Sequence, residues 1–179
     1  MKITVSEVTK ANWHDLEALF ESKGSPHYCW CMKWRPNPLS HRIMNKAQKK
    51  QALKHYVDRD VPIGIIGYEE GIPISWCSIA PRETCKALWG ETKLEKVWTV
   101  ACFFVKRPYR GKGITETLLH AAIEYAKKQG ANYVEATPAD SDSPSYGFMG
   151  RIPLLEKAGF QIIGKAGTRR HYMLLDIRP

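Results

Sequence analysis

Residues 97–130 read VWTVACFFVKRPYRGKGITETLLHAAIEYAKKQG and hold the clearest structural signal in the chain. The segment Val97 to Val105 is apolar at nearly every position, which is typical of a strand covered on both faces in the centre of a sheet. Pro108 then ends the strand because proline cannot donate to a ladder. From Ile114 onward, apolar residues recur on one helical face until two lysines and Gly130 close the pattern. These residues predict a strand, a glycine-rich turn and a helix.

The elements predicted on either side extend this unit. Tyr133 to Thr137 form another strand-like run, so the helix is predicted to cross between two parallel strands. No long linker, low-complexity run or internal repeat interrupts the chain, and we expect a single domain over residues 1–179. The periodicity further predicts strands at 3–8, 63–68, 74–80 and around His171, helices at 12–21 and 41–60, and a packed irregular loop at 25–40.

The turn before the long helix has the features of an anion site. The first backbone N–H groups of a helix have no partner within the helix and lie at its positive end, where phosphate oxygens can bind. Gly111 and Gly113 remove side chains that would block the backbone, while Arg110 and Lys112 add positive charge. The alternative is an ordinary strand-to-helix turn whose basic residues are incidental.

Spacing separates this turn from two common phosphate motifs. A Walker-type loop would need glycine at 106 and Ser or Thr at 113, where this chain has Lys106 and Gly113. A dinucleotide fingerprint would need a third glycine at 116, which is Glu116 here. The segment from Arg110 to Thr115 instead resembles the acetyl-CoA signature of the GNAT acetyltransferase superfamily, Arg/Gln-x-x-Gly-x-Gly/Ala, although Thr115 replaces the usual final small residue.

Other segments follow the order of the same family. The resemblance is closest over residues 97–160, and several short motifs look like one bacterial-type subgroup: VEATP at 134–138, Gly150, KAGF at 157–160 and the upstream CWCM at 29–32. The family resemblance implies an α/β (α+β) fold with a mixed, mostly antiparallel central sheet of about six to seven strands flanked by helices.

The resemblance also implies the chemistry. Acetyl-CoA would be the cosubstrate, and the amine of a small molecule or peptide would attack its thioester directly. The alternative is a catalytically silent acyl-CoA-binding module. The strand end formed by Phe103, Phe104 and Val105 would bind the pantetheine arm, and the pyrophosphate would bind Arg110, Gly111, Lys112, Gly113, Ile114 and Thr115.

The mechanism also needs a proton donor for the leaving sulfur. Many family members place a tyrosine immediately before the Glu of a Tyr-Glu-Lys-x-Gly-Phe-like stretch, but this position is Leu155 here. Tyr146, nine residues earlier, is the predicted substitute. It could instead be a packed or exposed loop residue, and a thiolate can also leave with little protonation near neutral pH.

Trp30 and Trp34 are predicted to contact the acceptor amine, with burial in the core as the alternative. Cys29 and Cys31 lie in the same segment but are separated by one residue, whereas paired cysteines of structural zinc sites are two to four residues apart. No second pair is evident, so we expect no metal. His171 is predicted to be a surface or paired histidine rather than a catalytic base.

Composition narrows the partners and the location. The chain has 179 residues and 44% hydrophobic residues, with no apolar run long enough to span a membrane. Its five cysteines are an odd number and point to reduced thiols, with the cytoplasm as the default location. The net charge of +9 suits any anionic partner. The predicted helix at 41–60 is basic, and we interpret its charged side as a solvated surface rather than a nucleic-acid site. The sequence leaves open whether the protein forms a homodimer.

Overall fold

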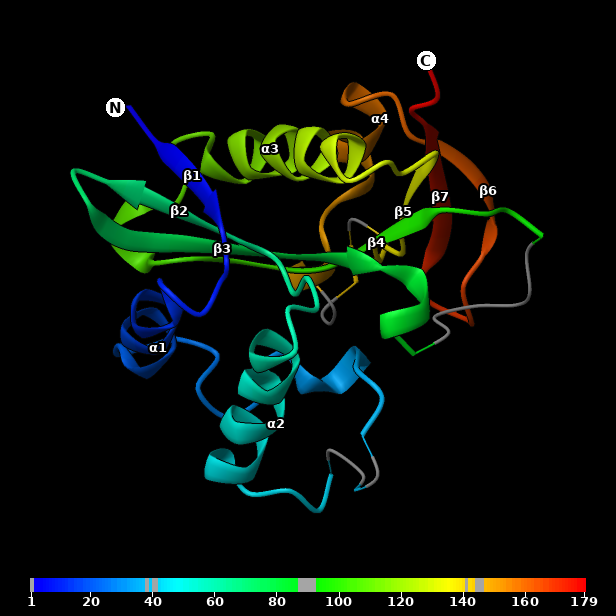
Figure 1. Ribbon diagram of the computed structural model, residues 1–179. Helices are drawn as coiled ribbons and strands as arrows, with labels where there is room; N and C mark the ends of the chain where they lie inside the picture. The colour runs from blue at the N-terminus through cyan, green and yellow to red at the C-terminus, as the bar shows by residue number, and fades with distance from the viewer. Residues whose placement is uncertain (1, 38, 40–41, 87–92, 141, 144–146) are drawn as a thin grey trace.

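The computed structural model has a mixed sheet between two layers of helices (Figure 1). It describes residues 2–179 apart from 38, 40–41, 87–92, 141 and 144–146. Within these residues the strand order is β1-β2-β3-β4-β5-β7-β6, and every neighbouring pair is antiparallel except β4 and β5. The predicted fold class is confirmed. The strands are β1 (Thr4–Glu7), β2 (Ile65–Glu69), β3 (Ile72–Pro81), β4 (Val97–Val105), β5 (Tyr133–Ala136), β6 (Gln161–Lys165) and β7 (His171–Asp176).

The helices divide between the two faces of this sheet (Figure 1). One face carries α1 and α2, and the other carries α3 and α4. No helix in the described residues is both long and apolar enough to cross a membrane. The helices are α1 (Trp13–Glu21), α2 (Lys46–Asp58), α3 (Ile114–Lys128) and α4 (Ile152–Lys157), with 3-10 turns η1 (Met32–Trp34), η2 (Arg82–Thr84), η3 (Arg107–Tyr109) and η4 (Gly147–Met149).

The central strand β4 contains a bulge that reverses the direction of its side chains. Ser78 of β3 pairs with Cys102 and Ile79 pairs with Val100, so Ala101 is an extra residue on β4. Side chains alternate between the faces of a strand, and one extra residue shifts this alternation. Val100 and Phe103 therefore both pack in the core under α3, whereas Cys102 packs in the core under α1 and α2.

The parallel strands β4 and β5 separate soon after they pair. Their register begins at Val97 with Tyr133 and ends at Val100 with Ala136, although β4 continues to Val105. In the described part of the chain, no strand pairs with the β5-facing edge of β4 beyond Val100. The sheet therefore opens at its centre, next to the turn that leads into α3.

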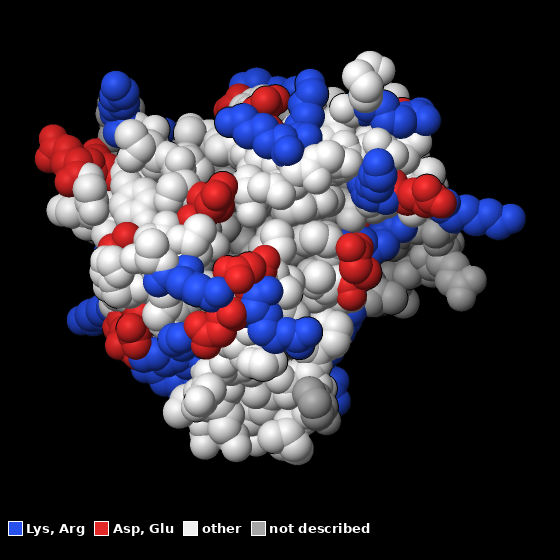
Figure 2. Space-filling model, viewed as in Figure 1, with Lys and Arg blue, Asp and Glu red and all other residues white. Residues whose placement is uncertain are grey.

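The basic helix α2 is part of a mixed charged surface. Lys50 forms ion pairs with Glu17 and Glu21 of α1, and Lys54 pairs with Asp58 four residues later. In Figure 2, acidic side chains lie among the basic ones across this face of the molecule. These pairs favour the solvated-face interpretation of α2.

Candidate active site

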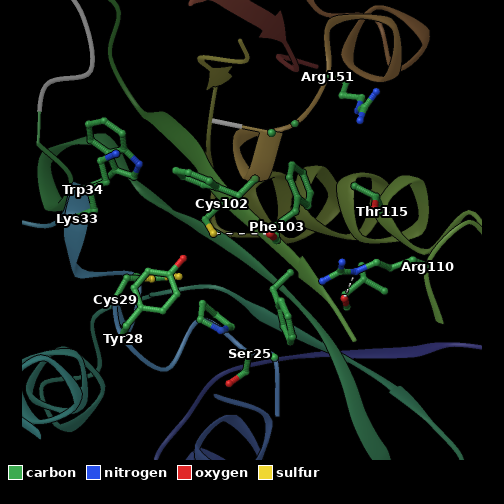
Figure 3. Close-up of a pocket in the computed structure, with 18 of the residues that line it drawn as sticks. Ser25, Tyr28, Cys29, Lys33, Trp34, Cys102, Phe103, Arg110, Thr115 and Arg151 are labelled. Carbon is green, nitrogen blue, oxygen red and sulfur yellow. Dashed lines mark hydrogen bonds between the residues drawn. The ribbon is translucent and has the colours of Figure 1, made fainter. Parts of the chain in front are cut away.

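A cavity of about 760 Å³ lies where β4 and β5 part (Figure 3). Its walls come from four segments that are far apart in the chain: residues 24–34, the end of β4, the turn before α3, and residues 147–154. Lys33 and Trp34 lie across the cavity from Thr115 (Figure 3). The cavity therefore connects the start of α3 with the segment that precedes α2.

The turn before α3 has the geometry of an anion site. Gly111 and Gly113 both have φ of +76°, a left-handed conformation that favours glycine. A Cβ at either position would meet nothing within 4 Å, so the space beside the backbone is open. The N–H groups of Glu116 and Thr117 return to the Gly113 carbonyl. Among the described residues, nothing accepts a hydrogen bond from the backbone amides of residues 111–115, which leaves them available for phosphate oxygens.

Arg110 joins this turn to the central strand. Its Nε donates to the Val105 carbonyl oxygen at 2.9 Å, and its side chain lines the cavity together with Thr115. The sequence predicted Arg110 only as a source of positive charge, whereas the structure adds a positioning role. The side chain of Ile114, the first residue of α3, is buried in the core, and Lys112 Nζ lies 5.6 Å from the centre of the Tyr109 ring.

The end of β4 forms the floor of the cavity. Phe103, Phe104 and Val105 all line it, as does Cys102. The structure thus brings the predicted pantetheine-binding strand into one cavity with Arg110 and Thr115, the two ends of the predicted phosphate turn, whereas residues 111–114 between them do not line it. The apolar run gives no sign of the bulge at Ala101 that turns Cys102 toward α1 and α2, so the sequence does not place Cys102 at the cavity.

Trp30 and Trp34 have different environments. Two consecutive residues, Trp30 and Cys31, have positive φ values of 44° and 50°, so the chain turns sharply between the tryptophans. Trp30 is fully buried against Phe20, with ring centres 5.2 Å apart, and it does not line the cavity. This burial favours the alternative in which Trp30 belongs to the core. Trp34 lines the cavity, and the centre of its ring is 4.9 Å from Lys33 Nζ and 5.0 Å from Arg170 Cζ.

Thiols form part of the wall near Trp34. A hydrogen bond with the Cys31 thiol raises the pKa of Cys29, and contact with Cys102 together with burial raises the pKa of Cys31. Both thiols therefore stay protonated near neutral pH, and a protonated thiol is a weak nucleophile. Within the described ranges, no group of three or more His, Cys, Asp or Glu side chains is arranged to hold a metal ion.

The family follows from a match over most of the chain. Residues 12–160 match the sequence model of the acetyltransferase (GNAT) family. This chain belongs to the GNAT family. No curated protein matches it.

Solved GNAT structures have the same fold at low sequence identity, which by itself supports the fold and not a substrate. An N-acetyltransferase from Staphylococcus aureus Mu50 is 14% identical with a TM-score of 0.61, covering 99% of this chain and 100% of its own. The putative acetyltransferase YncA from Salmonella typhimurium, solved with acetyl-CoA, is 15% identical with a TM-score of 0.60, covering 98% and 94%. The PaiA N-acetyltransferase from Thermoplasma acidophilum, solved with coenzyme A, is 15% identical with a TM-score of 0.59, covering 98% and 99%.

A buried polar network of this GNAT protein was missed by the sequence analysis. Glu135 of β5 accepts hydrogen bonds from Thr99 of β4 at 2.5 Å and from Tyr172 of β7 at 3.0 Å, and it forms an ion pair with Arg82. Thr99 and Glu135 form the register pair just before the last one between β4 and β5. The network therefore ties three strands together immediately before the sheet opens. Only the pairing of distant strands could have revealed it.

The remaining predicted residues lie away from the cavity or outside the described structure. His171 bonds to Asp140 through Nε2 and does not line the cavity, which favours the paired histidine. Leu155, at the usual position of the tyrosine, is fully buried in the core. Tyr146 lies outside the described residues, so its role stays a prediction, although Gly147 and Phe148 line the cavity.

Proposed function

We propose that this GNAT protein is an acetyl-CoA-dependent N-acetyltransferase that moves an acetyl group to a primary amine by direct attack on the thioester. The observation that carries the proposal is one cavity that runs from Arg110 and Thr115, on either side of the turn before α3, along the end of β4 to the segment around Trp34. A long cofactor and a separate acceptor need two binding regions, one near the turn before α3 and one near Trp34, joined by a passage in which the reacting groups can meet.

The residues on the cofactor side fit coenzyme A. The amides of residues 111–115 and the Arg110 side chain would hold the pyrophosphate, because hydrogen-bond donors and positive charge coincide there. Phe103, Phe104 and Val105 offer an extended backbone edge that can pair with the amide groups of the pantetheine arm. When bound, acetyl-CoA supplies an acetyl group activated as a thioester.

Direct transfer requires an amine in its free-base form beside the bound thioester. A free alkylamine has a pKa of about 10, so it must lose a proton before it can attack. The neutral thiols of Cys29 and Cys31 argue against an acetylated cysteine as a relay. The chain therefore contributes binding and orientation, and the amine forms the new bond to the acetyl carbon as the sulfur leaves.

The test is amine-dependent release of free CoA thiol from acetyl-CoA, with the acetylated amine identified by mass spectrometry. Thermal stabilisation by acetyl-CoA is measured in parallel, since a ligand that binds only the folded state raises stability. An enzyme gives both results. A silent acyl-CoA-binding module is stabilised by acetyl-CoA but releases no additional thiol with any amine, and that outcome contradicts the proposal.

A further inference from the structure

We propose that Arg35 is a positioning residue, which holds the segment 31–34 in place as the acceptor wall of the cavity. The inference rests on the proposed N-acetyltransferase function and adds to it a residue that does not itself line the cavity. It follows from the burial of Arg35, from the contacts of its guanidinium and from the strained backbone that precedes it.

The side chain of Arg35 is buried without a counter-ion. The residue is 1% exposed, and no carboxylate in the described part of the chain forms an ion pair with it. Burial raises the pKa of Tyr56 and the pKa of Cys85 although Arg35 opposes both shifts, so these two neighbours stay neutral near pH 7. A buried charge without a partner ion costs folding free energy, and residues that break a rule of stability are often found at functional sites.

The guanidinium of Arg35 joins several neighbouring segments. Its Nη2 donates to the Ile63 carbonyl oxygen just before β2 at 2.7 Å, with a longer contact to Ser78 Oγ of β3 at 3.4 Å. Its Nη1 lies 3.5 Å from Thr84 Oγ1 of η2. The Cζ atom is also 5.5 Å from the centre of the Tyr56 ring of α2. One side chain therefore fixes the end of η1 against two strands, a 3-10 turn and a helix.

The backbone beside Arg35 is held at the same place. The N–H of Lys86, two residues beyond Thr84, donates to the Trp34 carbonyl oxygen at 2.8 Å. The N–H of Arg35 donates to the Met32 carbonyl oxygen at 3.3 Å and closes η1. The contacts of Arg35 therefore reach the cavity through Trp34, whose side chain lines it.

The segment before Arg35 has a strained backbone that needs anchors on both sides. Trp30 and Cys31 have consecutive φ values of 44° and 50°, a left-handed conformation that residues with side chains rarely adopt. The buried Trp30 ring and a hydrogen bond from Trp76 Nε1 to Cys31 Sγ at 3.2 Å hold the start of this turn. Such strain persists only where surrounding contacts fix it. Arg35 supplies the contacts at the other end.

The anchored segment forms one side of the predicted reaction site. Cys31, Lys33 and Trp34 line the cavity, and Trp34 lies across it from Thr115 (Figure 3). A misplacement of about 1 Å between reacting groups can lower a rate about 100-fold. The predicted cofactor contacts come instead from β4 and from the turn before α3. Loss of Arg35 should therefore affect the acceptor and leave the cofactor bound.

The first experiment measures amide hydrogen exchange and needs no acceptor. Arg35→Met removes the guanidinium but keeps a long, unbranched side chain, and exchange in residues 29–35 should become about tenfold faster or more. Exchange in β4 and α3 should change little. Ile123→Ala is the control, because it empties a buried site in the core under α3 and should leave exchange in 29–35 unchanged. Unchanged exchange of 29–35 in Arg35→Met, or an equal rise throughout the protein, would overturn the inference.

The second experiment tests the acceptor side by kinetics with phenethylamine, phenylalaninamide and spermidine. For the best of these amines, Arg35→Met should lower kcat/KM by about tenfold or more, while the KM for acetyl-CoA stays within about twofold of the parent. Residues that act through one contact are not additive. Adding Arg35→Met to Trp34→Ala should therefore change the amine kinetics little further. Full additivity, or an equal loss of acetyl-CoA affinity, would contradict positioning through Trp34.

The conservative variant Arg35→Lys keeps the charge but not the fork of donors that reaches several acceptors at once. Exchange of 29–35 and the amine kcat/KM should lie between the values for the parent and for Arg35→Met. This variant also carries the test if Arg35→Met does not fold. Values equal to those of the parent in both measurements would contradict a role for the guanidinium.

The two experiments separate failure of the inference from failure of the proposed function. If an amine is acetylated but neither exchange nor amine kinetics depends on Arg35, the N-acetyltransferase function stands and the inference fails. If acetyl-CoA binds but no amine is acetylated, the proposed function fails. Hydrogen exchange then still decides whether Arg35 holds the wall.

Discussion

Gly113 shows how one residue can serve backbone geometry and ligand access together. Its φ of +76° is strained for any residue with a side chain, and the space where a Cβ would project is open. Gly130, at the other end of α3, has φ of +80° and the same open space. The two glycines differ chiefly in position, because only Gly113 lies beside the amides that we assign to the pyrophosphate.

Replacing these glycines separates strain from binding. We expect Gly113→Val and Gly130→Val each to lower the free energy of unfolding by about 1 to 2 kcal/mol, the cost of a left-handed non-glycine residue. Only Gly113→Val should also weaken CoA binding, by about tenfold or more, because its branched side chain fills the phosphate position. Chemical denaturation and calorimetry measure the two effects. Unchanged CoA affinity in folded Gly113→Val would refute the assigned phosphate site.

Tyr146 carries a second residue-scale prediction, for the proton that the leaving sulfur receives. Tyr146→Phe should keep acetyl-CoA binding but lower kcat by about 10- to 1000-fold if proton transfer limits turnover, since only the hydroxyl is removed. Steady-state and single-turnover kinetics would show this. A rate within about twofold of the parent would favour departure of CoA as a thiolate.

At the scale of elements, the opening of the sheet depends on how β4, β5 and β7 are held before it. Glu135 connects all three with Arg82, and its side chain is buried. Removing one partner of a buried ion pair leaves the other charge without compensation. The network therefore holds β4, β5 and β7 together immediately before β4 and β5 stop pairing.

Glu135→Ala should consequently destabilise the protein by about 3 to 5 kcal/mol. The exposed pair between Glu116 of α3 and Lys157 of α4 is the control, and Glu116→Gln should leave the urea midpoint nearly unchanged. Arg82→Met combined with Glu135→Leu should recover part of the loss, because both charges are then absent. A urea midpoint for Glu135→Ala equal to that of the parent would contradict a stabilising role for the network.

The segment before α2 carries another prediction at this scale, because its sharp turn sends two tryptophans to different places. Trp30→Ala should lower the free energy of unfolding by about 3 to 5 kcal/mol, as expected for emptying a large aromatic site in the core. Trp34→Ala should instead change the relative kcat/KM among amines while leaving acetyl-CoA affinity nearly intact. Denaturation and a panel of acceptors distinguish these outcomes, and a reversal of the two phenotypes would contradict the placement of the cavity wall.

At the scale of the whole molecule, long-range electrostatics should favour an anionic cofactor. The chain carries a net charge of +9, and the described charged residues that line the cavity are all basic. Such a field raises the local concentration of anions, and salt screens it over about 10 Å at 0.1 M.

The KM for acetyl-CoA should therefore rise with sodium chloride, by about three- to tenfold between low and about 0.5 M salt, while kcat stays nearly constant. Steady-state kinetics at fixed acceptor concentration provide the measurement. Phenylalaninamide at a pH above the pKa of its amine is a suitable acceptor, because it is then neutral and its own binding depends less on charge. A KM independent of salt would contradict an electrostatic contribution to cofactor binding.

The sequence by itself determined the local parts of this protein. The apolar run to Val105, the glycines at 111 and 113 and the one-sided pattern from Ile114 predicted β4, the turn and α3, because periodicity and glycine conformation act over a few residues. Tertiary structure alone decided the bulge at Ala101, the separation of β4 from β5, the burial of Trp30 and the network around Glu135. These features depend on pairing and packing between segments distant in the chain, so no local pattern specifies them. The cavity depends on both, because its turn and strand end were predicted locally and its opening follows from the separation of β4 and β5.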